Sequence, residues 1–213
     1  MADNFLENKF EELRAPKKQK TIIKQVGQSL DSLLIKNRSH RGYSHDVVIS
    51  REMLQRLVSV NTKIPSARNQ QCLRFKLVTQ DSGADIVLEN IKLGGALPEL
   101  HLPYPGTEPQ AFIIICSTQA ESKLVDIDLG ISVQSMLLKA VELGLNGIII
   151  GAFNKARLQE AFQLPYEPVL ILAIGKGIEH IQLVDIDESE SHNYYRQDNI
   201  HYVPKVKIDN LII

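Results

Sequence analysis

The chain has 213 residues, of which 44% are hydrophobic and 23% charged, and its formal net charge is −1. This length suits one domain with a sizeable core, or at most two small ones, and the composition is ordinary for a soluble globular protein. A net charge near zero excludes the general basic field that attracts nucleic acid. The sequence has no signal-peptide pattern and no apolar run near the roughly 20 residues that span a bilayer. We therefore expect a cytoplasmic protein with neither a nucleic-acid nor a membrane partner.

Cysteine and histidine side chains show no pattern of a catalytic or metal site. Cys72 and Cys116 lie far apart in apolar, strand-like sequence, which favours two small buried side chains over a disulfide. The six histidines have no metal-ligand spacing, and no serine lies in a nucleophile elbow. We therefore predict no metal site and assign no catalytic residue.

Two helical patterns open the chain. Apolar residues at helical spacing predict a short amphipathic helix within residues 3–14, which Pro16 and a basic run then end. This segment is too small to form a core, so residues 1–20 are predicted to be a helical arm that packs on the body or on a partner. A second apolar stripe predicts a helix over about residues 21–36.

A dense group of hydrogen-bond donors follows the second helix. Arg38, Ser39 and Arg41 place two guanidinium groups and a hydroxyl within four residues. This set matches the oxygens of a phosphate and suggests an anion site for a nucleotide-like cofactor. Taken alone, the segment is more typical of a solvated helix end, where basic residues favour the negative pole of the helix. His40 fits an orienting or solvent-facing side chain better than a base.

A polar loop comes after the next predicted helix, which begins at Ser50 and ends near Val60. Within residues 66–71, three amide side chains and a serine offer many donors and acceptors. Taken alone, this segment is more typical of a hydrophilic loop. Alternating apolar residues then predict a strand over residues 73–78.

The rest of the chain predicts strands separated by helices around one sheet. A Pro-rich irregular segment at 94–109 is of the kind that covers a site or a partner surface, and His101 and Tyr104 within it are candidates for an acceptor pocket or a plain surface loop. The apolar C-terminal tail is predicted to dock. The further predicted strands cover residues 111–116, 147–151 and 169–175, the helices cover 84–93, 126–144 and 156–162, and a surface loop covers 185–200. The fold class is α+β with a mixed sheet.

Four motifs in order resemble the nitroreductase-like FMN-dependent oxidoreductase family, from about Ile22 to Ile213. They are Arg38-Ser39-His40-Arg41-Gly42-Tyr43, the Pro65–Phe75 loop, Asp128-Leu129-Gly130 with Gln134 and the turn Leu143–Gly147, and Tyr202-Val203-Pro204-Lys205. The resemblance implies a single FMN-binding domain over residues 21–213 with a docked C-terminal tail. It implies a central mixed sheet flanked by helices, and a domain-intertwined homodimer with FMN at the subunit interface.

The resemblance also assigns roles to residues. Arg38, Ser39 and Arg41 hold the flavin phosphate, and Lys205 adds charge. The Pro65–Gln71 loop, through Ser66, Asn69 and Gln71 of the same or the neighbouring subunit, meets the polar edge of the ring. The backbone at Ile149, Ile150 and Gly151 passes near the reactive nitrogen of the flavin, where glycine permits a close approach.

The implied chemistry moves a hydride from NADH or NADPH through the flavin to a small electron acceptor such as a nitroaromatic or a quinone. Reductive dehalogenation and flavin fragmentation are alternatives within the family. An FMN-binding carrier or sensor without efficient turnover, and a nucleotide-binding module without flavin, are alternatives from other classes.

Two positions depart from the family pattern. Asn37 stands where many members carry another arginine, which leaves one formal charge fewer at the phosphate. Val206 stands where a second basic residue is common, with Lys207 one place later. A shift of one residue in an extended segment points a side chain to the opposite face, so the role of Lys207 stays open. Gly175-Lys176-Gly177 lacks the third glycine of a dinucleotide turn and is not assigned to one.

Overall fold

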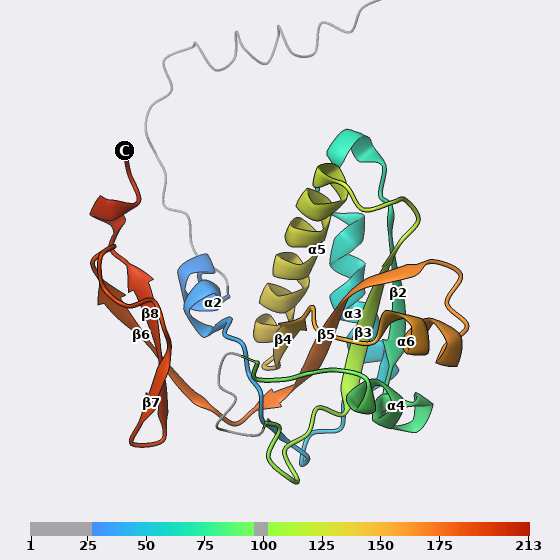
Figure 1. Cartoon of the computed structure of the whole chain (residues 1–213), viewed down its shortest axis with the longest axis horizontal. Helices are drawn as coiled ribbons and strands as arrows, with labels where there is room; N and C mark the ends of the chain where they lie inside the picture. Colours follow the sequence, from blue (N-terminus) through green and yellow to red (C-terminus); the bar gives the residue numbers. More distant parts are fainter. Residues whose placement is uncertain (1–26, 96–101) are drawn as a thin grey trace, which may run out of the picture.

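The computed structural model describes residues 27–95 and 102–213 (Figure 1). The predicted helical arm at residues 1–20 and His101 lie outside these ranges. The described chain combines helices with two sheets, which confirms the α+β class.

The long strand β5 (Glu167–Gly177) organises the larger sheet. It pairs with β1 (Tyr43–Ser44), β3 (Ala111–Ser117) and β4 (Asn146–Ile150), and β3 pairs in turn with β2 (Leu73–Val78). All these pairs are antiparallel. The parallel pairing that makes the architecture mixed lies in the isolated bridge between Ser39 and Gly147 and in the smaller sheet.

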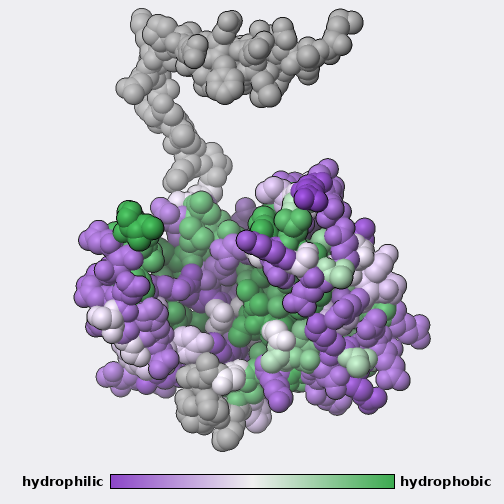
Figure 2. Space-filling model, turned by 45° about the horizontal axis from the view of Figure 1, so that its top comes forward, coloured by the Kyte–Doolittle hydropathy of each residue, from purple (hydrophilic) through white to green (hydrophobic). Residues whose placement is uncertain are grey.

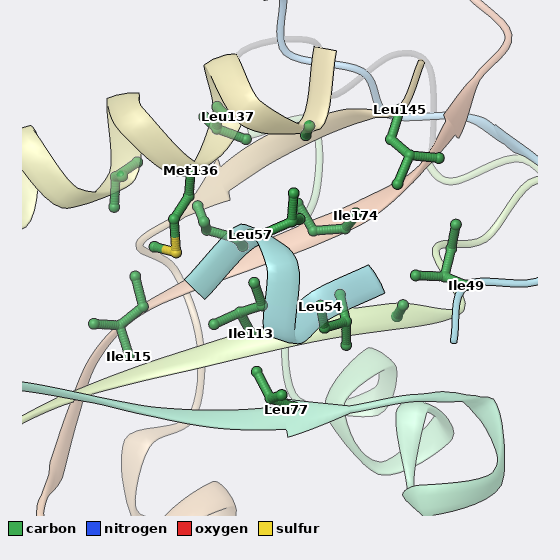
Figure 3. Packing of buried hydrophobic residues seen from close by; sticks show 14 residues of the cluster. Ile49, Leu54, Leu57, Leu77, Ile113, Ile115, Met136, Leu137, Leu145 and Ile174 are labelled. Carbon is green, nitrogen blue, oxygen red and sulfur yellow. The ribbon is translucent and has the colours of Figure 1, made fainter. Parts of the chain in front are cut away.

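Helices cover both faces of the larger sheet because its central strands are apolar on both sides. All seven residues of β3 are buried, as the continuous apolar run predicts. On one face, residues of β3 and β5 pack with α3 (Arg51–Val58) and α5 (Lys123–Glu142). Figure 3 shows Leu54, Leu57 and Met136 in the layer between α5 and β3. On the other face they pack with α4 (Ala84–Glu89) and α6 (Lys155–Ala161).

The helix α5 is the longest in the described part of the chain, with 20 residues. It begins three residues before the predicted start because Ser122 caps it, its side chain accepting the N–H of Val125 at 3.4 Å. Gly144 follows the last turn with a left-handed φ of 77°, as predicted for a helix end that glycine terminates.

The smaller sheet was not predicted. It contains β6 (His180–Ile186), β7 (Tyr195–Gln197) and β8 (Ile200–Val206); β6 and β8 are parallel, and β7 is antiparallel to β8. The predicted loop over residues 185–200 is therefore wrong at both ends, because backbone pairing there prevails over the polar side chains. Figure 1 shows this sheet to one side of the main body, next to α2.

Two other predicted helices differ from the structure within the described ranges, and residues 21–26 of the first prediction lie outside them. The helix α2 (Leu30–Lys36) begins at Leu30, where Ser29 caps it, and residues 27–29 are not helical because Gly27 has a left-handed φ of 110°. The helix predicted over residues 84–93 ends at Glu89. The short 3₁₀ turns lie at Ser59–Thr62, Ala67–Asn69, Gln80–Ser82 and Ile208–Asn210.

The C-terminal residues lie partly in the smaller sheet. Strand β8 is paired on both edges, but Ile208, Leu211 and Ile212, which follow it, are each at least 65% exposed within one chain. Docking of this apolar C-terminal end therefore stays a prediction, and it would need a surface outside the described contacts of this chain. None of the helices in the described ranges has the length and apolar content needed to cross a bilayer.

Gly147→Ala tests the packing of α5 on β4. An added Cβ would lie 2.6 Å from Leu137 Cδ2 and 2.8 Å from the carbonyl oxygen of Ala173, so we expect the free energy of unfolding to fall by about 1–3 kcal/mol, as in an overpacked core. Urea denaturation measures it. Gly130→Ala is the control, because nothing lies within 4 Å of its added Cβ. Equal stability of Gly147→Ala and the wild type would contradict this packing.

Candidate functional site

The donor-rich segment Arg38–Tyr43 lies between α2 and β1 and runs beside β4. Ser39 forms a parallel bridge with Gly147, and the N–H of His40 donates to the Gly147 carbonyl at 3.2 Å. The Tyr43 hydroxyl donates back to the His40 carbonyl at 2.7 Å. We call this stretch the phosphate segment, since it contains the residues predicted to hold a phosphate.

Two glycines of β5 give the phosphate segment its place. A Cβ on Gly175 would lie 2.6 Å from the Tyr43 ring, and one on Gly177 would lie 2.1 Å from His40 Nδ1. Any larger residue at these positions would push the segment off the strand. The Gly-Lys-Gly sequence that lacked a dinucleotide pattern thus has a packing role.

The two arginines of the phosphate segment are held in different ways. Arg38 is half-buried, its Nη2 donates to the Leu34 carbonyl at 2.6 Å, and burial lowers its pKa. Arg41 is buried, its Nη1 donates to the Ser39 carbonyl at 3.2 Å, and its guanidinium lies 5.6 Å from the centre of the Tyr194 ring. The Nε atoms of both arginines are buried without a hydrogen-bond partner. Unpaired donors of this kind suit an anionic ligand.

Burial keeps His40 neutral. His40 is 6% exposed, and burial lowers its pKa to about 4; Glu179 raises the pKa, whereas Arg41, Lys176 and His201 lower it. A neutral ring packed on Gly177 supports a positioning role, in agreement with the interpretation that His40 is not a base.

The predicted amide loop forms a connected network just before β2, which lies at the opposite edge of the larger sheet from β1. The N–H of Gln71 donates to Ser66 Oγ at 2.9 Å, and Gln71 Nε2 donates to Asn69 Oδ1 at 3.0 Å. Pro65, Ser66 and Gln71 line a cavity of about 520 Å³ between α3, β2 and α5. The structure thus brings the loop residues of the family motif together.

Asp128 of α5 holds this loop in shape. Its buried carboxylate accepts the Ser66 hydroxyl at 2.5 Å and the N–H of Ala67 at 2.6 Å. Arg68, Asn69 and Gln71 have left-handed φ values of 51°, 53° and 48°, a conformation that costs free energy for side chains other than glycine. We infer that the contacts of Asp128 offset this strain.

The remaining predicted residues lie at two other places. Along β4, Ile149 is exposed and Ile150 is buried, and Gly151 has open space around its Cβ position. From Gly147, beside the phosphate segment, to Gly151 the strand rises about 13 Å. This stretch of chain therefore has the donor-rich phosphate segment beside one end and an open glycine at the other.

Lys205 lies on the smaller sheet. It is exposed on β8, in register with Asp185 of β6. Lys207 pairs with Asp187 at 3.1 Å, and this hydrogen bond raises its pKa. Within the described chain, Lys207 is therefore engaged with its own sheet.

Tyr104 lies apart from the open end of β4. It lines a cavity of about 250 Å³ together with Gly42 and Ile178. The end of β4 pairs with Ile171, which is seven residues, or about 23 Å of extended chain, from Ile178. The candidate role of Tyr104 in an acceptor pocket stays a prediction.

The helix α5 relates the phosphate segment to the amide loop. Asn37 Nδ2 donates to Gln134 Oε1 at 3.3 Å, whereas the loop is held at Asp128. Six residues of helix separate these anchors by about 9 Å along the axis and about 120° around it. Asn37, which precedes the phosphate segment, and the amide loop thus contact different sides of α5.

The comparison with known families decides the identity of this fold. The model of the nitroreductase family matches residues 34–176, which is more than half of the 213 residues. The chain belongs to the nitroreductase family. A search of curated proteins finds no match.

Solved structures of the nitroreductase family share the fold. A nitroreductase family protein from Clostridium difficile is 24% identical, with a TM-score of 0.56, and the match covers 70% of this chain and 85% of that one. A protein from Exiguobacterium sibiricum, named as a nitroreductase and solved in complex with FMN, is 22% identical, with a TM-score of 0.59 and coverage of 73% and 91%. An FMN-dependent nitroreductase from Clostridium difficile is 23% identical, with a TM-score of 0.57 and coverage of 71% and 89%.

Several residues of the candidate site were not predicted individually. Asp128 was visible as part of a motif, and its role follows from its two hydrogen bonds to the loop. Glu179 and Arg196 carried no signal, because their partners lie far away in the sequence. Within the described ranges, no group of three metal-ligating side chains is present.

Asp128→Ala tests the anchor of the amide loop. Two donors lose their acceptor, so we expect the free energy of unfolding to fall by about 1–3 kcal/mol, with the greatest loss of amide protection in residues 66–71. Urea denaturation and hydrogen exchange measure these effects. Asp126→Ala, exposed on the same helix, is the control. Unchanged protection of the loop in Asp128→Ala would show that the anchor is not needed.

The pKa of His40 predicts a dependence of stability on pH. Between pH 6.5 and about pH 4 the unfolded chain binds a proton that folded His40 does not. Stability from this group is therefore fully present above pH 6.5 and falls as the pH drops, by up to about 3 kcal/mol. His40→Gln should remove this component, as measured by urea denaturation across the range. Parallel pH profiles for the two proteins would refute the assignment.

Proposed function

We propose that this protein is an FMN-dependent oxidoreductase that moves a hydride from NADH or NADPH to a small electron acceptor, such as a nitroaromatic or a quinone, in a ping-pong cycle. The observation that carries the proposal is the pair of buried, unpartnered guanidinium Nε atoms in the phosphate segment beside β4. Membership of the nitroreductase family supports it, as do the FMN-bound and FMN-dependent relatives.

The phosphate segment would hold the phosphate group of FMN. Arg38, Ser39 and Arg41 supply charged and neutral donors that fit a phosphate. Lys205, exposed on β8, would add a positive charge. Asn37 donates to Gln134, and its neutral amide adds no charge at the position where the family pattern often has arginine.

The ring of the cofactor would lie toward the end of β4. The open space around Gly151 leaves room for its backbone to approach the ring, which a side chain would prevent. Ser66, Asn69 and Gln71 would meet the polar edge of the ring with hydroxyl and amide groups. When bound, FMN supplies the hydride chemistry, and the protein supplies binding and orientation.

A homodimer would complete the site. Asn37, which precedes the phosphate segment, and the amide loop contact α5 about 120° apart around its axis. In the proposed dimer, a loop from the second copy would serve the cofactor held by the first. Apolar side chains gather across one face of the molecule (Figure 2), and those exposed on α2 and α5 are Leu30, Leu34, Ile35, Leu124 and Ile127. Exposed apolar area of this kind favours association with another subunit.

We place this enzyme in the cytoplasm. Cys72 and Cys116 are buried free thiols, and burial raises the pKa of Cys116 to about 11. Unpaired cysteines fit a reducing compartment.

An absorption spectrum after loading with FMN and removal of the excess tests the proposed cofactor. We expect the wild type to retain a flavin band and Arg38→Ala/Arg41→Ala to lose most of it. Under anaerobic conditions, NADH or NADPH should bleach the band, and a quinone or nitroaromatic should restore it. Retained flavin without turnover would indicate a carrier or sensor, and a wild type that retains no flavin would refute the proposal.

Gly151→Ala tests the approach of the backbone to the ring. Nothing within the chain lies within 4 Å of the added Cβ, so the stability of the cofactor-free protein should be unchanged. We expect FMN affinity to fall at least fivefold, because a methyl group would stand where the ring comes close; fluorescence quenching of FMN measures it. Equal affinity would place the ring elsewhere.

A further inference from the structure

The geometry assigns Glu179 as a positioning residue for the phosphate segment: its carboxylate holds the backbone of Arg41 and Gly42 in place and ties it to Arg196 on the smaller sheet. This inference rests on the proposed function, since it concerns how the cofactor phosphate is recognised. It adds a residue outside the four sequence motifs.

The carboxylate of Glu179 is fully engaged. Its Oε2 accepts the backbone N–H groups of Arg41 and of Gly42, the latter at 3.3 Å. Its Oε1 accepts Arg196 Nη2 in an ion pair, and the Glu179 side chain is 10% exposed. Three donors around a carboxylate that is largely shielded from solvent fix its position.

Two consecutive N–H groups that converge on one oxygen form the kind of concave site that binds anions. In this chain an internal carboxylate occupies that site. The backbone of Arg41 and Gly42 is therefore not available to a phosphate, which must be recognised by the side chains of Arg38, Ser39 and Arg41. Those side chains keep their direction only while the backbone beneath them is held.

Glu179 also lies between β5 of the larger sheet and β6 of the smaller sheet. It lines both the cavity of about 490 Å³ that contains Arg38 and His40 and the smaller cavity beside Gly42. Arg196 belongs to β7, which pairs with β8, the strand that contains Lys205. The Glu179–Arg196 pair thus connects the smaller sheet, which carries Lys205, to the phosphate segment, which carries Arg38 and Arg41.

Two roles for Glu179, one through its position and one through its charge, predict opposite effects of substitution on phosphate binding. If Glu179 acted only through its negative charge, Glu179→Gln would bind a phosphate more tightly, and Glu179→Asp would behave as the wild type. If it acts by position, both variants weaken binding. Glutamine keeps one acceptor oxygen and turns an NH2 group toward either the backbone N–H groups or Arg196, and aspartate is one methylene too short to reach both.

The test is the affinity for FMN and for riboflavin, which lacks the phosphate, measured by flavin fluorescence on the full-length protein. We expect Glu179→Gln and Glu179→Asp to weaken FMN binding at least tenfold and riboflavin binding less than threefold. Glu167→Gln, which removes a charge from the exposed far end of β5, is the matched control and should leave both affinities unchanged. Unchanged or tighter FMN binding in Glu179→Gln, or wild-type binding in Glu179→Asp, would overturn the inference.

Amide hydrogen exchange of the wild type covers the case in which the variants do not fold. The N–H groups of Arg41 and Gly42 should be protected in the cofactor-free protein, and exchange at the rate of free amides would overturn the inference. A wild type that binds no FMN would instead refute the proposed function, so the two failures are distinguishable.

Discussion

Close packing of the phosphate segment on β5 is the constraint on which the site depends. Gly175 and Gly177 leave room for Tyr43 and His40 to lie directly against the strand. The same strand pairs with β3 and β4, so the sheet and the segment share one support. Because close-packed interiors transmit small displacements, a side chain at either glycine would disturb the core and the arginines together.

The helix α5 imposes the second constraint. It contacts Asn37, the residue before the phosphate segment, on one side and the amide loop on another. The strained loop is held by Asp128, while the segment is held by backbone pairing with β4 and by Glu179. In the proposed dimer, each site consists of the phosphate segment of one chain and the amide loop of the other, which we call two half-sites. The apolar surface of α2 and α5 would bring the two chains together.

Much of the fold could be predicted from the sequence, and the misses have physical reasons. The apolar pattern predicted β3, whose seven residues are all buried, and α5, whose buried residues recur at helical spacing. The smaller sheet was missed because β7 has only three residues and the parallel partners β6 and β8 are separated by a polar stretch, so no local pattern marks their pairing. Motifs predicted Arg38 and the amide loop, whereas Glu179 and Gly177 act through contacts between distant segments, which no spacing reveals.

Complementation between two inactive variants tests the central claim most directly. One chain would carry Arg38→Ala, the other Asn69→Ala/Gln71→Ala, with different tags so that mixed dimers are purified. If each cofactor is held by the phosphate segment of one chain and the loop of the other, both parents bind little FMN, and the mixed dimer regains one intact site of two. Retained flavin at half the wild-type level is the result that we predict. A mixed dimer that binds no more FMN than its parents would contradict the account, because the two half-sites would then belong to the same chain.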